Sequence, residues 1–169
     1  MKSRAGFTLL EFALVVLLVG LLGSVLLERV LFYQEQAEKT AMEQTVGVLR
    51  SALRLQIAER LPNGRQSLLG LIEANPMAWL ERKPESYLGD RFGPAPSSIP
   101  GGSWYFDLRD KTLVYVVAGR QFAANNGGRQ QIRYQVRPLA NKTQVEMVEA
   151  DKSSIDGLSL VLLEPYRWF

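Results

Sequence analysis

The sequence of 169 residues contains no cysteine and no histidine. Without cysteine the chain can form neither a disulfide nor a thiolate metal site. Without histidine it lacks the most common general base and the most common metal ligand. It also has no G-x-S-x-G, P-loop or dinucleotide-binding motif. We therefore expect no catalytic residues, no cofactor and no metal site, and we do not expect the protein to be an enzyme.

The sequence also has little net charge. The formal value is +3, and without Lys2 and Arg4 the remaining 18 basic residues nearly balance 17 acidic ones. A body this close to neutral lacks the broad basic surface that phosphate binding requires, so nucleic acid is not the expected partner. One locally basic stretch, from Arg120 to Lys142 with Arg129, Arg133 and Arg137 between them, leaves DNA binding open as an alternative to a solvated strand face.

The acidic residues of the second half are scattered rather than clustered. We expect them in turns or at strand edges, as ordinary surface residues: Asp107, Asp110, Glu146, Glu149, Asp151 and Asp156. No dense run of alternating Asp and Asn is present, so the sequence predicts no calcium site.

A long apolar run is present from Phe7 to Leu27, with Glu11 as its one charged residue. As a helix it is about 30 Å long, the hydrocarbon thickness of a bilayer. Lys2 and Arg4 precede it, so its start is expected in the cytoplasm and the rest of the chain across the membrane. A cleaved secretory signal is the competing interpretation. However, its apolar core is shorter and ends at a small-x-small site, which residues 28–32 do not offer.

Glu11 is unusual in this run, because a carboxylate at the centre of a membrane helix costs on the order of 2.5 to 3.5 kcal/mol. Its position near the start would also let it reach the lipid headgroups. The surrounding residues favour a functional role for Glu11 over a simple position among the headgroups. Gly6-Phe7-Thr8-Leu9-Leu10-Glu11, after a short basic leader and before an apolar helix, resembles the type IV prepilin signal of pilins and type II secretion pseudopilins.

This resemblance covers about the first 30 residues. It implies that a prepilin peptidase cleaves between Gly6 and Phe7 and N-methylates Phe7, and that Glu11 pairs with the amine of a neighbouring subunit to set the register. The implied organisation is a leader (1–6), a transmembrane and assembly helix (7–30) and a periplasmic pilin-like head (31–169). The implied location is the bacterial inner membrane, with later inclusion in a filament.

The implied partners are the peptidase and methyltransferase, other pilin or pseudopilin subunits, the inner-membrane assembly platform and the lipid bilayer. The expected role is that of a structural subunit, with a lean toward a minor one because no disulfide is present. Two alternatives remain: a DNA-uptake pilin, and a single-pass anchored periplasmic binding module. Many family members carry a proline where this chain has Glu28 and Arg29. Gly20 and Gly23 either weaken the helix locally in its place or form a helix-packing face.

The rest of the chain predicts an α+β fold, in which one long helix packs by its second half on an antiparallel β-meander. No proline interrupts residues 7–61, and Leu61-Pro62-Asn63-Gly64 ends the helix. Apolar residues recur at helical spacing at Met42, Val46, Leu49, Leu53 and Ile57. A coiled-coil stalk is the alternative, although this stripe is too short for sustained heptads.

The remaining segments predict short helical pieces, loops and strands. Short helical pieces are expected at 67–72 and 76–80, an irregular loop at 84–102, a hairpin over 103–117 and a third strand over 131–137. Further strands are expected near 145–148 and 158–162, and residues 119–130 are expected to form an exposed connection. The aromatic end, 166–169, is expected either to pack on the head or to contact another subunit.

Overall fold

The computed structural model describes residues 8–93, 99–128, 130–139 and 157–168. The chain forms two compact units, residues 1–40 and 41–169, and helix α1 contributes to both. The fold is α+β, with a long N-terminal helix and a five-stranded mixed sheet. The expected strand near 145–148 lies outside the described residues.

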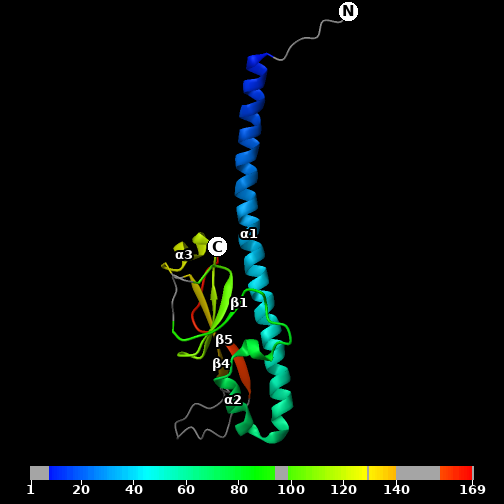
Figure 1. Cartoon of the computed structure of the whole chain (residues 1–169), viewed down its shortest axis with the longest axis vertical. Helices are drawn as coiled ribbons and strands as arrows, with labels where there is room; N and C mark the ends of the chain where they lie inside the picture. The colour runs from blue at the N-terminus through cyan, green and yellow to red at the C-terminus, as the bar shows by residue number, and fades with distance from the viewer. Residues whose placement is uncertain (1–7, 94–98, 129, 140–156, 169) are drawn as a thin grey trace, which may run out of the picture. The chain divides into compact units, whose positions relative to one another are not determined.

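The long helix α1 spans Leu9–Arg60 without a break (Figure 1). Its end follows the predicted signal: a 3₁₀ turn, η1 (Leu61–Asn63), has Pro62 in its first positions, and Gly64 follows at φ 90°. A positive φ of this size favours glycine, so the chain leaves the helix direction here. The single helix predicted from the absence of proline is confirmed.

A connecting segment follows in short helical turns. These are η2 (Arg65–Leu68), α2 (Leu69–Ile72) and η3 (Pro76–Trp79), in agreement with the predicted short helical pieces. Asn75 caps η3, because its side-chain oxygen accepts the Met77 N–H at 2.9 Å. Leu68, Leu71 and Met77 from this segment are buried in the core of the head.

The sheet has the strand order β1-β2-β3-β4-β5. Strand β2 (Ser103–Asp107) and β3 (Thr112–Val116) form the predicted hairpin, β4 (Gln131–Pro138) alternates buried and exposed residues, and β5 (Leu158–Leu162) pairs with β4. The pairings β2–β3, β3–β4 and β4–β5 are antiparallel. The predicted hairpin, third strand and C-terminal strand are confirmed.

Strand β1 (Tyr87–Arg91) corrects the prediction of an irregular loop and of a wholly antiparallel sheet. It pairs with β2 in parallel, and its register shifts between Tyr87 and Asp90. Gly89 lies in this irregularity at φ 86°, a conformation that residues with a Cβ rarely adopt. A parallel edge strand depends on a crossover connection rather than a local turn, so sequence alternation does not reveal it.

Helix α3 (Arg120–Asn125) corrects a second prediction, because residues 119–130 were expected to form only an exposed connection. Phe122 in this helix is 2% exposed. Its ring lies 5.2 Å from that of Trp168, centroid to centroid, and Trp168 is itself buried. Trp168 therefore packs on the head, which was one of the two expectations for the aromatic end.

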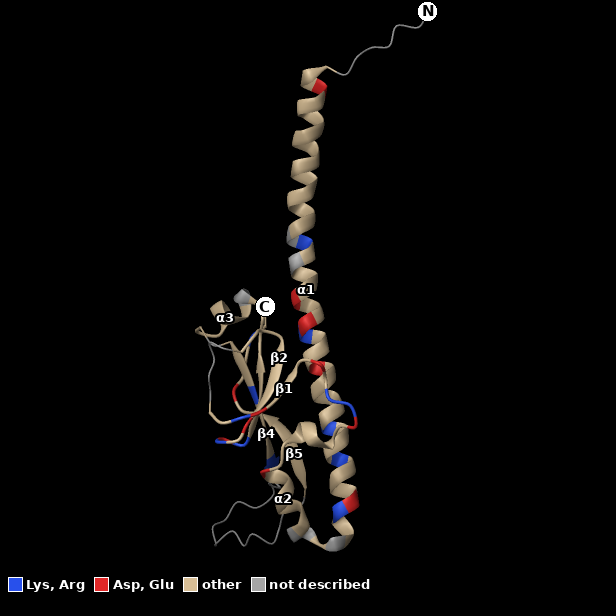
Figure 2. Cartoon of the chain, in the orientation of Figure 1, with Lys and Arg blue, Asp and Glu red and all other residues tan. Residues whose placement is uncertain are grey.

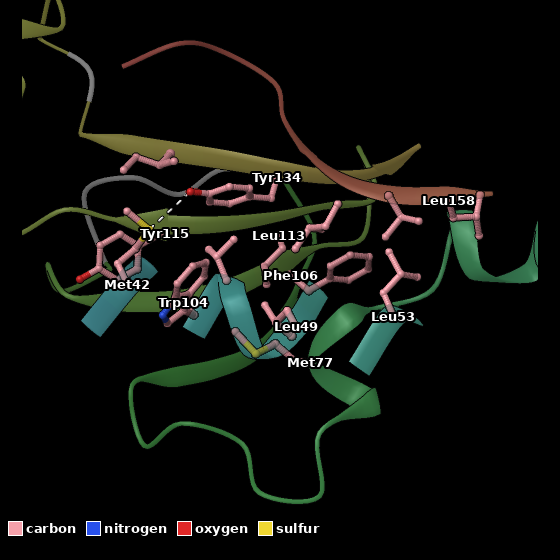
Figure 3. Packing of buried hydrophobic residues seen from close by; sticks show 14 of the residues in the cluster. Met42, Leu49, Leu53, Met77, Trp104, Phe106, Leu113, Tyr115, Tyr134 and Leu158 are labelled. Atoms are coloured by element: carbon pink, nitrogen blue, oxygen red, sulfur yellow. Dashed lines mark hydrogen bonds between the residues drawn. The ribbon is translucent and has the colours of Figure 1, made fainter. Parts of the chain in front are cut away.

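The core of the head lies between one face of the sheet and one stripe of α1 (Figure 3). Met42, Val46, Leu49 and Leu53 of α1 are at most 4% exposed, as the spacing predicts, and Ile57 is partly buried against the same core. The sheet contributes alternate residues of its strands, among them Trp104, Phe106, Leu113, Tyr115, Ile132 and Tyr134. The Tyr134 hydroxyl donates to Met42 Sδ at 3.4 Å, which ties β4 to the helix.

Candidate functional site

The first turn of α1 is closed by Thr8 and includes Glu11. The Thr8 hydroxyl oxygen accepts the Glu11 N–H at 3.3 Å, and the Thr8 carbonyl accepts the Phe12 N–H at 3.0 Å. Thr8 is therefore the N-cap, and Glu11 is the third residue of the helix. Thr-x-x-Glu is also the sequence of a capping box, a signal that could have identified Thr8 in advance.

Glu11 lies where the exposed N–H groups give the helix its positive end, which favours a carboxylate. Its side chain is exposed. Gly6 and Phe7, the predicted cleavage and methylation residues, lie outside the described residues, so the structure places Glu11 but not its expected partner.

The segment after Glu11 is apolar on all sides. Every side chain from Thr8 to Leu27 is exposed, including Leu17 at 66% and Leu22 at 58%. Figure 2 shows one acidic turn at the start of α1, followed by a long stretch of tan ribbon. In the sequence, no charged residue lies between Glu11 and Glu28. A helix that is apolar all round is typically buried, in a protein core or in a membrane.

This part of α1 is long and apolar enough to cross a membrane, by length and composition. Helix α1 continues unbroken through Gly20 and Gly23, so neither glycine interrupts it. A Cβ added at either position would meet no atom within 4 Å. Both remain candidates for a close-packing face toward another helix.

Among the described residues, no group of three or more acidic side chains could hold a metal ion. The acidic residues at 146, 149, 151 and 156 lie outside the described residues.

Asp107 differs from the surface residue that was expected, because its side chain is fully buried. Its Oδ1 accepts the N–H groups of Gly93 and Arg109, and its Oδ2 lies 3.8 Å from the Arg133 guanidinium. This carboxylate therefore fixes two loops and is balanced by a cation. The sequence signal was its position at the end of a strand whose other residues are all buried.

The locally basic stretch is partly neutralised within the head. Arg133 lies 3.2 Å from Asp110 Oδ2 in addition to its contact with Asp107. The Arg137 Nε donates to Gln135 at 2.9 Å. Arg129 and Lys142 lie outside the described residues. The arginine at the centre of the stretch is thus engaged by carboxylates of the same chain, which reduces what it can offer to a phosphate.

A polar cluster fastens β1 to the connecting segment. The Tyr87 hydroxyl donates to Asp90 Oδ1 at 2.7 Å, and the Asn75 amide donates to both at 2.6 Å. Burial, followed by the hydrogen bond to Asp90, raises the pKa of Tyr87 above its ordinary value of 10.0. Burial also raises the pKa of Tyr134. Both hydroxyls therefore stay protonated at neutral pH and can donate their hydrogen bonds, Tyr87 to Asp90 and Tyr134 to Met42.

No known protein family, characterised protein or solved structure matches the chain. The case for a function therefore rests on two features of the chain itself. One is the exposed apolar helix with its single carboxylate, and the other is the resemblance of residues 6–11 to a processing signal.

Proposed function

We propose that the chain is a structural subunit of a type IV pilus or a type II secretion pseudopilus, a minor subunit rather than an enzyme. A prepilin peptidase cuts between Gly6 and Phe7 and methylates Phe7. The processed subunit waits in the bacterial inner membrane with its head in the periplasm. The assembly platform then draws it into a filament in which apolar helices pack together.

The observation that carries this proposal is Glu11 at the start of an apolar helix that nothing in the described part of the chain covers. The positive end of a helix favours a carboxylate at this position, but a charge beside a long apolar run carries a cost in lipid that an anchor alone does not require. Cleavage before Phe7 creates an ammonium one turn away. Two adjacent subunits can then pair the amine of one with Glu11 of the other, so each added subunit relieves an unpaired charge.

The pairing accounts for register as well as affinity. Four residues separate Phe7 from Glu11, so a neighbour shifted by one turn, about 6 Å, brings its amine level with this carboxylate. Apolar packing alone is tolerant of sliding, because lipid and side chains are equally apolar. A charge pair in a low-dielectric surrounding restricts the helices to one axial position.

The test replaces Glu11 by alanine in the full chain. Processing and membrane insertion should persist, because the Gly6–Phe7 junction and the apolar segment are intact, while incorporation into filaments falls. Glu59→Ala is the matched control, since Glu59 is an exposed carboxylate near the other end of the same helix. Normal incorporation of the Glu11→Ala chain would remove the register role, whereas absence of the unaltered chain from filaments would favour a simple membrane-anchored binding module.

A further inference from the structure

A groove lies between the second half of α1 and the segment before β1. Its apolar lining consists of Val48, Leu80 and Pro84, and its charged lining consists of Arg82, Lys83 and Glu85. Val48 is 49% exposed, although the neighbouring Leu49 is fully buried. The groove therefore presents apolar surface next to two cations and one carboxylate.

The two cations, Arg82 and Lys83, have no anionic partner among the described residues. Both side chains are exposed. Lys83 Nζ lies 5.7 Å from the centre of the Tyr87 ring, a contact that leaves its charge uncompensated. A carboxylate that enters this groove would gain two nearby cations against the single repulsion from Glu85.

Glu43 is a carboxylate on the same helix as Val48, one of the residues that line the groove. It is exposed and forms no ion pair with a described basic residue. It precedes Val48 by five residues, so the two side chains point about 140° apart around α1. Groove and carboxylate thus lie on different faces of one subunit. A contact between two different faces is head-to-tail, and with a rise and a rotation it generates an open filament rather than a closed dimer.

The axial positions agree with the register proposed above. A neighbour whose Phe7 is level with Glu11 is shifted by four residues along α1. The same shift brings its Glu43 level with Gly47, between Thr45 and Val48, which both line the groove. One offset therefore satisfies a charge pair at each end of the packed helices.

We propose that this groove binds Glu43 of a second copy of the chain, with Arg82 and Lys83 as its partners. The inference rests on the proposed function, because the chain must assemble for two copies to meet in parallel. It requires at least two copies to be neighbours in the filament, which a subunit of low abundance still permits.

The absence of cysteine makes cross-linking a direct test, because each introduced thiol is unique in its chain. Two tagged full-length forms, Glu43→Cys and Lys83→Cys, are produced together in the host membrane and oxidised. We expect a mixed disulfide dimer. The matched control pairs Lys83→Cys with Glu59→Cys, which lies sixteen residues further along α1, about 24 Å away. This pair should not cross-link.

A third variant, Gly20→Cys, reports packing between the apolar helices at a position outside the groove, where an added Cβ meets no atom within 4 Å. Self-cross-linking at Gly20→Cys without the Glu43→Cys to Lys83→Cys product would overturn the groove contact and leave the proposed function standing. Failure of both products would also overturn the contact between two copies, whereas the proposed function fails separately, if the chain isolated from membranes is not cut between Gly6 and Phe7. A Lys83→Cys chain that cross-links to a different protein but never to its own kind also overturns the inference.

Charge reversal distinguishes a specific pair from general proximity. In the Gly20→Cys background, Glu43→Lys alone or Arg82→Glu with Lys83→Glu should lower the cross-link yield by roughly fivefold. All three reversals combined in one chain should restore most of the yield. All three side chains involved are exposed, so the far-ultraviolet circular dichroism of the head should not change. No recovery in the combined variant contradicts the charge pair.

Discussion

The two halves of α1 differ in what covers them, although they belong to one continuous helix. In the second half, four apolar residues of one stripe, Met42 to Leu53, are at most 4% exposed against the sheet. In the first half, every side chain from Thr8 to Leu27 is exposed. An amphipathic stripe can be satisfied by one sheet, but a helix that is apolar on all sides cannot. Within the described residues, nothing covers the first half of α1.

Replacing one leucine in each half of α1 by alanine should give the largest difference in the stability of the head. Leu49→Ala removes a fully buried side chain and should lower the free energy of unfolding of the head by about 2 to 5 kcal/mol. Leu17→Ala, at a position 66% exposed, should change it by less than about 0.5 kcal/mol. Denaturation of the full chain in detergent, followed by near-ultraviolet circular dichroism, measures both. Equal losses would contradict the division of roles.

Close packing also distinguishes glycines of the two regions. A Cβ at Gly101 would lie 2.4 Å from the Ala118 Cα, whereas a Cβ at Gly20 meets nothing within 4 Å. Gly101→Ala should therefore cost about 1 to 3 kcal/mol of head stability through backbone displacement. Gly20→Ala should leave the head unchanged. The same detergent denaturation measures both variants, and an unchanged Gly101→Ala head would show that the turn can move without cost.

Alkaline pH should weaken the head and spare α1's first half. Burial raises the pKa of Tyr87, Tyr105, Tyr134 and Tyr166 above the ordinary value of 10.0. Above pH 10 the unfolded chain loses these protons while the folded head retains them, so stability present below pH 10 falls as pH rises. One such group contributes a slope of at most about 1.4 kcal/mol per pH unit.

Tyr134→Phe tests that slope. Removal of the Tyr134 hydroxyl should make the free energy of unfolding less dependent on pH above 10. It also removes the hydrogen bond to Met42 Sδ at neutral pH. A pH titration of the denaturation midpoint compares the two chains. An unchanged slope would show that Tyr134 ionises as readily in the folded head as in the unfolded chain.

The smallest effect is a gain in stability. Gly47 lies inside α1, and a Cβ there meets no atom within 4 Å. Gly47→Ala should stabilise the head by up to about 1 kcal/mol, because alanine favours a helix interior. The thermal midpoint of unfolding provides the measurement. A loss of filament incorporation without loss of stability would indicate instead that a neighbour approaches closely at Gly47, as the groove contact implies.

Local patterns in the sequence correctly predicted the elements that are determined by residues close together in the chain. The spacing of Met42, Val46, Leu49 and Leu53 predicted the buried stripe, and the alternation from Gln131 to Arg137 predicted β4. The hairpin of β2 and β3 depends on a short turn between adjacent strands, which composition reveals. In each case the residues that set the structure lie close together in the chain.

The missed elements depend on contacts between distant residues. Strand β1 contains Gly89 and pairs in parallel with β2, so neither alternation nor a turn signal marked it. Helix α3 is short and borders a glycine- and asparagine-rich segment, and it is held by the contact of Phe122 with Trp168. The burial of Asp107 likewise depends on Gly93 and Arg133, which lie far from it in sequence.

The sequence predicted the key residue of the candidate site, but only part of the site's geometry. The sequence singled out Glu11, because one charge in an apolar run is conspicuous. It did not reveal the Thr8 cap that places the Glu11 backbone in the first turn. The roles of Gly6 and Phe7 stay predictions, since they concern an enzyme and a neighbouring subunit rather than the fold of this chain.

The most direct test of the account is the mass of the N-terminal peptide from the chain isolated from membranes of its host. The account predicts a peptide that begins at Phe7 and carries one additional methyl group on its amine. A peptide that begins at Met1 or Lys2, or after a cut beyond Leu27, would contradict it, because no amine would then exist one turn from Glu11.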